Sequence, residues 1–573
     1  MQHTTTRLVE IRAASGAHWG ACAMPSEASV TAAAPPAQVI GAWTPLRHPS
    51  FRALWLAMLT SNIGTWVQDV AAAWFMSERT GSPLMVAAVQ SATTLPVVAF
   101  ALVAGTLADI VDRRRYLLGV QLWMFFVATV VALQAHAGRL DAWSLLCLTF
   151  ALGAGAAMAM PAQAATTADL VPRPMLAPAV AMGAIGMNIA RSIGPALGGL
   201  IVARFGAAWA FSLNALSFLG VVFVLWRWRP SKSVSALPAE SFGGALRAGL
   251  RYAARASEFR SVLIKSACFF VFASALPSQL AIVVRQRLSA GAGTYGMLLT
   301  FIGAGAIGGA IALPKLRKRF DADTLVPAAT LLYSLTMLAL AGLRDLRLLC
   351  VAMLVNGVSW ITVLSSLQTA AHVSVPAWVR ARALSLYIVV FSAGMAGGSL
   401  LWGTIAQQAG TGWALTSAAV LAVLAGIFSL RFRLSVAMAR DTTPSAHWTQ
   451  PTPAAKFDPE RGPVLVTVEY LIEPADREEF LHHIHLLGGT RRRDGAVQWG
   501  VMEDVGQPGR FLEYFIVDSW LEHLRQHERV THEEKHLQDR LLALHRDARP
   551  PSVRHFVGAS PSSSHFVPLE NIP

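Results

Sequence analysis

Charged residues are scarce in this chain of 573 residues: they make up 14% of it, whereas hydrophobic residues make up 54%. An ordinary soluble domain has roughly 25% charged residues, so the composition excludes a typical soluble enzyme and a disordered scaffold. Cysteine is scarce as well, and the four cysteines lie too far apart for a metal motif or a disulfide framework. No Gly-x-x-x-x-Gly-Lys-Ser/Thr loop is present, which argues against an ATP-driven pump.

Long apolar runs are what the chain has instead. Between residues 51 and 432 these runs reach twenty residues or more, which matches the roughly 20 residues that cross ~30 Å of hydrocarbon. We therefore expect an all-α membrane protein with twelve transmembrane helices in a 6+6 arrangement. The expected spans are 51–76, 84–108, 116–137, 143–163, 174–203 and 207–228, then 261–285, 292–314, 324–343, 347–369, 380–408 and 412–432.

The net charge of +14 lies mostly in short clusters between the apolar runs, which does not fit a nucleic-acid-binding surface. Connections 113–115, 229–260, 315–319 and 380–382 are dense in Lys and Arg, whereas the alternate connections carry one or two arginines. Because positive loops stay on the cytoplasmic side, the pattern predicts a multi-pass protein of the cell (inner) membrane with both termini in the cytoplasm. The lipid bilayer is a predicted partner, and nucleic acid is not.

Composition divides the chain further. We predict a disordered cytoplasmic tail, for which a transit peptide is the alternative, then two six-helix halves and a small soluble domain, joined by linkers and followed by a second disordered tail. In this order the segments are 1–50, 51–228 (first half), 229–260 (linker), 261–433 (second half), 434–463 (linker), 464–558 (soluble domain) and 559–573.

The two halves match each other at a constant offset of 204 residues. Gly105 and the arginines at 113–115 correspond to Gly309 and the basic residues at 317–319, and Gly153 corresponds to Gly357. A repeated half is the plan of secondary transporters, which bind their substrate between halves that rock about it.

The connection between the second and third spans contains a motif. It reads Gly105-Thr-Leu-Ala-Asp109-Ile-Val-Asp-Arg113-Arg114-Arg115, and it resembles the loop signature of the major facilitator superfamily, Gly-x-x-x-Asp-Arg/Lys-x-Gly-Arg/Lys-Arg/Lys. The sequence departs from that signature at two positions, where it has isoleucine and aspartate. The resemblance implies that Asp109 caps the N-terminus of the helix beginning at residue 380, where the dipole favours a carboxylate, and so latches one transport state. The alternative is a charged loop that only fixes topology.

Two further stretches, 61–69 and 188–199, resemble the transmembrane secretion effector branch of that superfamily, which includes enterobactin exporters. This resemblance implies a secondary active transporter that exports a small molecule (a siderophore, drug or other secondary metabolite) by alternating access. It also implies that proton entry drives the export, so that the expected partners are a small-molecule substrate and the proton. We expect neither a cofactor nor catalytic residues.

Two ionisable residues, Asp69 and Arg191, are expected deep within spans, about eighteen positions from the cytoplasmic start of each, or ~27 Å at 1.5 Å per residue. Charges in a membrane are costly and often mark a pathway or a pair, so we predict an ion pair that takes part in coupling or in substrate contact. The alternatives are a purely structural pair and an Asp69 that reaches the outer interface. The residues expected at close helix contacts are Gly194, Pro195, Gly198, Gly199, Gly394, Gly397 and Gly398.

The residue pattern of the soluble domain predicts the order strand, helix, strand, strand, helix, strand, which fits an α+β ferredoxin-like fold. The expected elements are 464–472, 474–487, 496–504, 510–519, 520–543 and 553–557. The stretch 515–527 resembles dimeric domains of the antibiotic-biosynthesis monooxygenase type, which implies a homodimer. We expect two copies to pack sheet face to sheet face and to bury Val464, Val466, Val468, Phe511, Phe515 and Val517 between them. Two other functions remain open at this point: a cofactor-independent monooxygenase and a membrane-anchored sensor.

Two histidine pairs in this piece, His523/His527 and His532/His536, have the i, i+4 spacing that can hold a metal. Several glutamates lie beside them, at 522, 528, 533 and 534. These charges favour a solvated helix face, and no metal site is predicted.

Overall fold

The computed structural model describes residues 43–228, 250–376, 378–434, 445, 455–456, 460–547, 549–559 and 567–568. Most of the predicted tails (1–50 and 559–573) and linkers (229–260 and 434–463) therefore lie outside the described residues. The first tail is shorter than predicted, because a 3-10 helix η1 (Thr44–Arg47) and then α1 begin before residue 51. Each of these helices begins with proline in its first turn, where its missing N–H costs no hydrogen bond.

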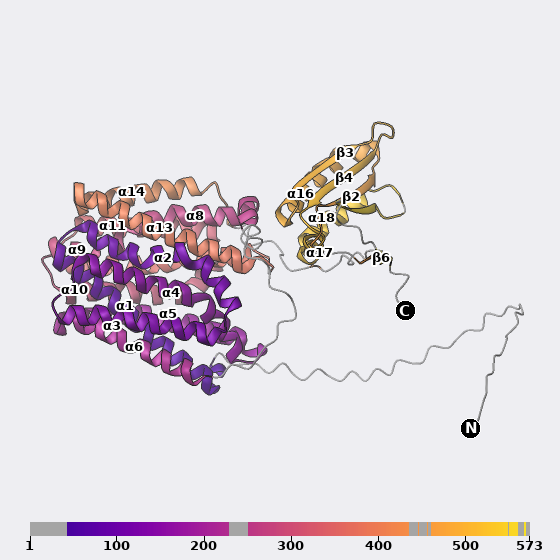
Figure 1. Cartoon of the computed structure of the whole chain (residues 1–573). Coiled ribbons are helices and arrows are strands. Elements are labelled where there is room, and N and C mark those ends of the chain that lie inside the picture. Colours follow the sequence, from indigo (N-terminus) through magenta and orange to yellow (C-terminus); the bar gives the residue numbers. More distant parts are fainter. Residues whose placement is uncertain are drawn as a thin grey trace, which may run out of the picture. The chain divides into compact units, whose positions relative to one another are not determined.

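Residues 43–434 form a bundle of long helices that lie side by side (Figure 1). The helices of the first half are α1 (Pro49–Thr80), α2 (Pro83–Ile110), α3 (Arg113–His136), α4 (Ala142–Leu170), α5 (Leu176–Phe205) and α6 (Ala207–Arg227), with η2 (Arg173–Met175) before α5. Those of the second half are α8 (Ser257–Ala273), α9 (Ala275–Gln286), α10 (Ala292–Arg317), α11 (Ala322–Gly342), α12 (Leu346–Val373), α13 (Arg380–Ala409) and α14 (Thr411–Ser429).

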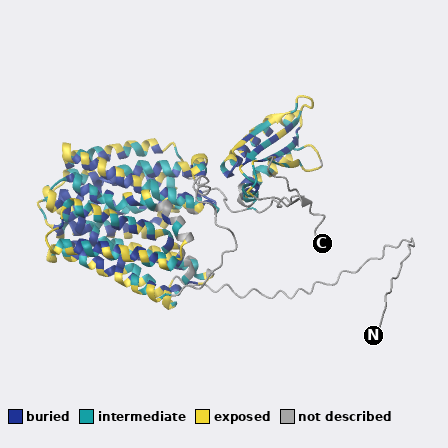
Figure 2. Cartoon of the chain, viewed as in Figure 1, coloured by how far each residue is buried: buried dark blue, intermediate teal, exposed yellow. Residues whose placement is uncertain are grey.

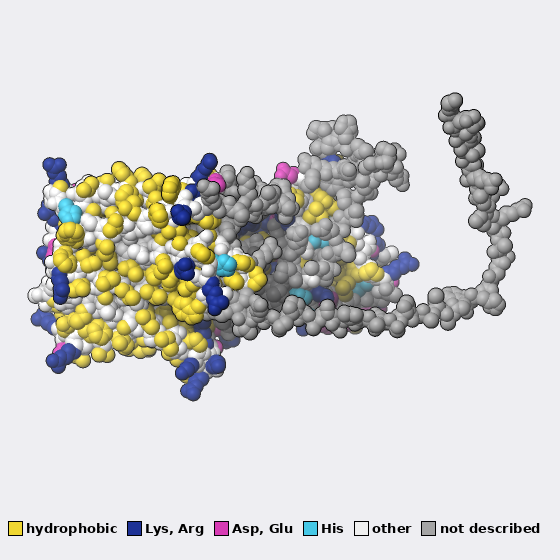
Figure 3. Space-filling view, turned by 90° about the horizontal axis from the view of Figure 1, so that it is seen from below, with side chains coloured by type: hydrophobic (Ala, Val, Ile, Leu, Met, Phe, Trp, Pro, Cys, Tyr) yellow, Lys and Arg dark blue, Asp and Glu magenta, His cyan; other side chains and the backbone are white. Residues whose placement is uncertain are grey.

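The bundle has the surface of a membrane protein. Within the described residues, eleven segments are long and apolar enough to cross a bilayer, with α8 and α9 forming one of them. Figure 3 shows a broad hydrophobic side, with Lys and Arg gathered toward its ends, and large side chains such as Phe126 and Trp413 are 63% and 71% exposed. The helix outside this set is α1, which carries Asp69 and other charged residues. The count of twelve spans therefore remains a prediction.

The single span predicted over 261–285 consists of two helices that meet at Ser274. Pro277 has no N–H to donate to the carbonyl of Ala273, one turn earlier, which weakens the helix there. The hydroxyl of Tyr333, on α11, donates to that carbonyl at 2.9 Å. The break is therefore stabilised by a neighbouring helix rather than left open.

The contacts between helices repeat from one half to the other. In the first half α2 packs on α4 and α3 on α6, and in the second α10 packs on α12 and α11 on α14. Between the halves, α5 packs on α10 and α13 packs on α2. The matched glycines take part: Gly153 faces the backbone of α2, and Gly357 faces the backbone of α10.

The soluble domain, described by itself, has a four-stranded antiparallel sheet with the strand order β3-β4-β2-β5. Its main elements are β2 (Val464–Leu471), α16 (Arg477–Asp494), β3 (Gln498–Glu503), β4 (Arg510–Val517), α17 (Trp520–Arg529), α18 (His532–Ala543) and β5 (Ser552–Val557). Short elements add η3 (Pro474–Asp476) and the paired strands β1 (Ala455–Lys456) and β6 (Val567–Pro568). The one long helix predicted over 520–543 is two helices, because Thr531 and Glu534 form a capping box that starts α18.

The two faces of this sheet differ from the prediction. Val464, Val466 and Val468 belong to the domain's own core with α16, and each is 8% exposed or less. Figure 2 shows buried residues along the strands of this domain. The residues between them point to the other face, because side chains alternate along a strand. That open face includes Met502, Leu512 and Phe556, which are 56%, 37% and 51% exposed. A dimer through the face predicted from the sequence is therefore excluded, since the helices already cover it.

Candidate functional site

The first half encloses a pocket of about 270 Å³ between α1, α3, α4, α5 and α6. It lies toward the end of the bundle where α3 begins and α6 ends, here called the loop-signature end. No charged side chain is among the described residues that line it. Neutral polar groups face it together with apolar ones, including Asn62, Gln121, Gln163, Thr166 and Thr167, and Phe51, Trp55, Met58, Met160 and Met187.

Two polar groups of this pocket differ in what they contact. The indole N–H of Trp55 donates to the carbonyl of Met182 at 2.8 Å, which holds α1 against α5. The Gln121 side chain is 3% exposed, and its carbonyl oxygen has no hydrogen-bond partner among the described residues. A buried acceptor without a partner is costly, so this oxygen is suited to accept a hydrogen bond from a bound molecule.

Asp69 and Arg191 do not form the predicted ion pair within the described part of the chain. The guanidinium of Arg191 lies over the ring of Trp66, 5.8 Å from its centroid. Asp69 is three residues further along α1, about 4.5 Å at 1.5 Å per residue, and lies close enough to Tyr295 of α10 to act on it electrostatically. Equal depth in the sequence therefore places both charges in the bundle without placing them on facing sides.

Close to Asp69, the two halves are joined at the end opposite the loop-signature end. Trp74 of α1 stacks on Tyr295 of α10, with 6.0 Å between ring centroids. Gln286 donates to the carbonyl of Gly81 at 2.8 Å, and Arg285 donates to the carbonyl of Ser77. These bonds connect the end of α9 to the end of α1.

Most of the predicted packing glycines lie at helix contacts. Gly194 and Gly198 face α1, Gly199 of α5 meets Gly296 of α10 between the halves, and Gly394 and Gly398 face α8. Pro195 lies buried inside α5. Gly397 is different, since it is exposed and no described atom lies within 4 Å of the position that a Cβ would take. Its predicted packing role is wrong, because it points away from the helix that its two neighbours contact.

The loop signature falls at the turn from α2 to α3. Gly105 and Asp109 lie in the last turns of α2, and their surroundings are outside the described residues. Arg113 opens α3, and Arg115 is exposed. Arg114 donates to the carbonyls of Leu225 at 2.9 Å and of Trp226, which caps the C-terminus of α6. The basic residues of the signature therefore have unequal roles, and Arg114 holds a helix end.

The departure from the signature also has a structural role. Asp112, which stands where the signature has glycine, accepts a hydrogen bond from the Arg115 N–H at 2.9 Å. It is therefore the N-cap of α3.

An ion pair in the second half was missed in the sequence. Lys265 of α8 is 2% exposed and donates to Asp323 of α11 at 3.1 Å. Asp323 also accepts from the backbone N–H of Leu434, where the chain leaves the bundle. The available signal was a single lysine in an otherwise apolar run, four residues inside the predicted start of the span.

The family described as transmembrane secretion effector matches residues 40–563, which include both the bundle and the soluble domain. The chain belongs to this family. Curated relatives that match parts of the chain are named as efflux proteins, and the chain is a multi-pass membrane protein of this family. The predicted family is thereby confirmed.

Individual relatives are distant. The macrolide efflux protein A of Streptococcus pyogenes is 24% identical over 30% of this chain and 41% of its own length. The multidrug efflux pump Tap of Mycobacterium tuberculosis is 32% identical over 30% of this chain and 42% of its own length. The chain thus spans about two fifths of the length of these two relatives. The staphyloferrin A transporter of Staphylococcus aureus is 22% identical over 48% of this chain and 70% of its own length.

Solved structures show the same fold of the bundle. A bacterial homologue of the human lysosomal transporter Spinster, in an inward-facing and unoccupied conformation, has a TM-score of 0.51 at 17% identity and covers 69% of this chain and 96% of its own. A POT family transporter in complex with 5-aminolevulinic acid has a TM-score of 0.56 at 12% identity, with 68% and 97% covered. At these identities the likeness concerns the fold alone.

Proposed function

We propose that this protein is a secondary active transporter that exports small amphipathic molecules by alternating access, driven by proton entry. The observation that carries the proposal is the neutral pocket of the first half, in which buried polar groups lie among apolar and aromatic ones. Such a lining suits a molecule that is largely apolar but has a few hydrogen-bonding groups. The relatives named for macrolide, multidrug and staphyloferrin A transport support this substrate class.

Alternating access needs a contact between the halves that opens during the cycle. The bonds from Arg285 and Gln286 to the end of α1 are such a contact, and they lie at the end opposite the pocket. We infer that the described conformation is closed at this end, and that a second state breaks these bonds. Asp69 is placed beside this contact, next to Tyr295, and we assign it the role of proton-coupling group.

Purified protein in proteoliposomes tests the proposal. With an imposed proton gradient, we expect accumulation of a radiolabelled macrolide or of an iron-free siderophore, and its loss on adding a protonophore. The Asp69→Asn variant should lose gradient-driven accumulation but retain exchange of labelled for unlabelled substrate. Glu78→Gln is the matched control, because Glu78 lies on the same helix and accepts from the Trp74 indole. Equal accumulation with and without the gradient would contradict proton coupling.

We further propose that the loop signature latches one state of the cycle. Asp109→Asn should slow export sharply in protein that still reaches the membrane, and Arg113→Ala should have a milder effect because Arg114 and Arg115 remain. Export at the rate of the unmodified protein by a well-expressed Asp109→Asn variant would refute the latch.

The topology proposed for the inner membrane has α1 as a twelfth span and both termini in the cytoplasm. Gly138, between α3 and α4, and Lys318, after α10, are exposed at the two opposite ends. In a cysteine-free background, a membrane-impermeant maleimide should label Gly138→Cys but not Lys318→Cys in intact cells. The reverse labelling would invert the proposed orientation.

The soluble domain is proposed to have the ferredoxin-like fold and to form a homodimer through its open sheet face. The exposed apolar side chains of that face, Met502, Leu512 and Phe556, support this. Light scattering of the full-length protein in detergent should show a dimer, and Leu512→Glu with Phe556→Glu should give a monomer. Val505→Glu is the control, because Val505 is 98% exposed in the loop between β3 and β4. A monomeric unmodified protein would exclude this dimer.

A further inference from the structure

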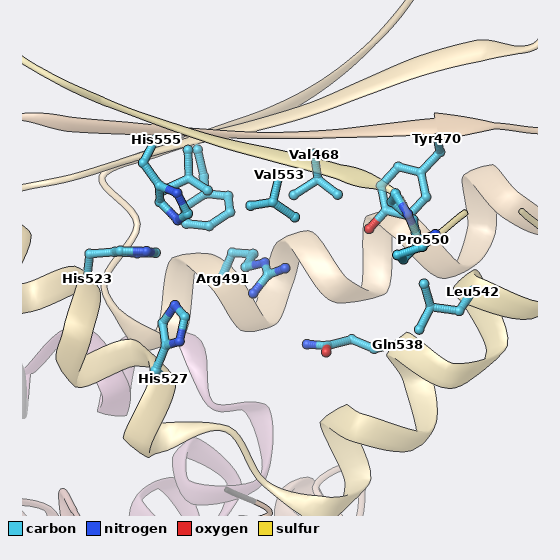
Figure 4. A pocket seen from close by; sticks show the side chains of 13 residues that line it. Val468, Tyr470, Arg491, His523, His527, Gln538, Leu542, Pro550, Val553 and His555 are labelled. Carbon is cyan, nitrogen blue, oxygen red and sulfur yellow. The ribbon is translucent and has the colours of Figure 1, made fainter. Parts of the chain in front are cut away.

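The soluble domain has a cavity of about 410 Å³ between its sheet and its helices. Three histidines line one end of it: His523 and His527 from α17, and His555 from β5 (Figure 4). The ring centroid of His523 lies 4.8 Å from that of His527 and 4.7 Å from that of His555. One ligand-forming nitrogen from each ring lies within 4.8 Å of the other two. The cluster thus joins a helix to a strand that the sequence separates by 28 residues or more.

His523 is the most buried of the three, at 1% exposed, which corrects the predicted solvated face. Neither of its ring nitrogens has a hydrogen bond of ordinary geometry to a described residue. Burial, followed by the neighbouring His527 and His555, lowers the pKa of His523 to about 3. A buried imidazole whose nitrogens lack well-formed hydrogen bonds costs stability, and a metal ion bound to one of these nitrogens would offset part of that cost.

The cation among the described residues that line this cavity is paired with a carboxylate. Arg491 lines the cavity, and its Nε donates to Glu513 at 3.2 Å. Glu513 is also held by the indole of Trp499 at 3.0 Å. An added cation at the histidines therefore faces a paired arginine and not a free positive charge.

We propose that His523, His527 and His555 bind one divalent first-row transition metal ion, with an open coordination position facing the cavity. Imidazole nitrogens suit zinc, copper, iron and nickel, and the two helical histidines have the i, i+4 spacing found in such sites. In a tetrahedral site with metal–nitrogen bonds of about 2.0–2.1 Å, the nitrogens lie about 3.4 Å apart. The rings must therefore move inward by about 1 Å or more, which small side-chain rotations provide. The site is independent of the transport function proposed above.

Metal titration of the full-length protein tests this site. Protein purified in detergent with a tag free of histidine, and stripped with a chelator, is titrated with Co²⁺ while the visible ligand-field absorption is followed. We expect a saturable band at one equivalent, displaced by Zn²⁺. His523→Gln and His555→Gln should each weaken binding by roughly 100-fold or more, above the loss known for residues that only support a ligand.

The second histidine pair provides the matched control. His532 and His536 have the same helical spacing in α18, so the His532→Gln/His536→Gln double variant should retain the band. Zn²⁺ should also raise the melting temperature of the unmodified protein and of this control, because a ligand that binds the native state stabilises it. If His523→Gln does not fold, His527→Gln, which changes a half-buried ring, decides with His555→Gln. Absence of a one-equivalent site, or its persistence in the His527 and His555 variants, would overturn the proposal.

Discussion

The two halves of the bundle share one helix plan but fill their interiors differently. In the second half aromatic rings pack together, with Phe270 at 4.6 Å from Phe391 and 5.8 Å from Trp360 between centroids. Two of its polar contacts are Lys265 with Asp323 and Asn356 with Thr336, although Gln279, Tyr387 and Ser399 also have buried polar atoms without a hydrogen-bond partner among the described residues. The first half instead keeps a pocket with the unpartnered oxygen of Gln121. The two halves therefore share their helix arrangement but not the packing of their interiors, and Gln121 differs from the unpartnered groups of the second half in facing a described pocket.

The largest expected effect concerns the ion pair of the second half. Lys265→Met should destabilise the protein by about 3 kcal/mol, because it removes the buried cation that pairs with the carboxylate of Asp323, whose side chain is 20% exposed. The measurement is thermal unfolding in detergent together with the amount that reaches the membrane.

The double variant Lys265→Met/Asp323→Leu should recover much of this loss, since no unpaired charge remains. A Lys265→Met variant as stable as the unmodified protein would show that the ion pair does not stabilise the bundle.

Losses of stability of the same size or smaller are expected at the matched glycines Gly153 and Gly357, which allow the two halves to be compared directly. A Cβ at Gly357 would overlap the backbone of Ile302, whereas a Cβ at Gly153 would lie 2.8 Å from the Thr93 carbonyl. We expect Gly357→Ala to cost about 3 kcal/mol and Gly153→Ala about 1 kcal/mol, within the range for overpacking. Gly220→Ala is the control, because no described atom lies within 4 Å of its Cβ position. Equal losses at Gly153 and Gly357 would mean that the two contacts are equally tight.

The positions of the helices could be predicted from the sequence better than the side-chain contacts of the candidate sites. Apolar runs place most helices because length and hydropathy are local properties. The repeat relates positions such as Gly153 and Gly357, both of which lie at helix contacts in the structure. The break at Ser274 was not predicted, since it depends on another helix. The hydroxyl of Tyr333 donates to the Ala273 carbonyl in place of the N–H that Pro277 lacks. The histidine cluster was missed for the same reason: His555 reaches His523 only through the sheet. Pairings across elements are tertiary, and a periodic pattern does not contain them.

A smaller effect should distinguish Gln121, which faces the pocket, from Asn356, which holds two helices together. Gln121→Leu should weaken substrate binding by about 1 kcal/mol, or roughly fivefold, if the side chain gives one hydrogen bond to the cargo. Its stability should not fall, because the lost oxygen has no partner among the described residues. Asn356→Leu should do the opposite and lower stability with substrate affinity retained, because Asn356 donates to Thr336 at 2.9 Å. Substrate affinity in detergent and the thermal unfolding temperature are measured for both variants. A stability loss for Gln121→Leu would mean that this residue contributes to the packing of the bundle.

The smallest effect is expected at Gly397, the one predicted packing glycine that faces outward. Alanine at this position meets no described atom within 4 Å, and inside α13 it is favoured over glycine by up to about 1 kcal/mol through helix propensity. We therefore expect Gly397→Ala to leave stability unchanged or to raise it slightly, with export unaffected. Gly398→Ala, one residue later, should be destabilising, because its Cβ would overlap the Val271 carbonyl. Measured by thermal unfolding, a loss at Gly397 as large as that at Gly398 would mean that both faces of α13 are packed, and that the helix contacts a further surface in the membrane.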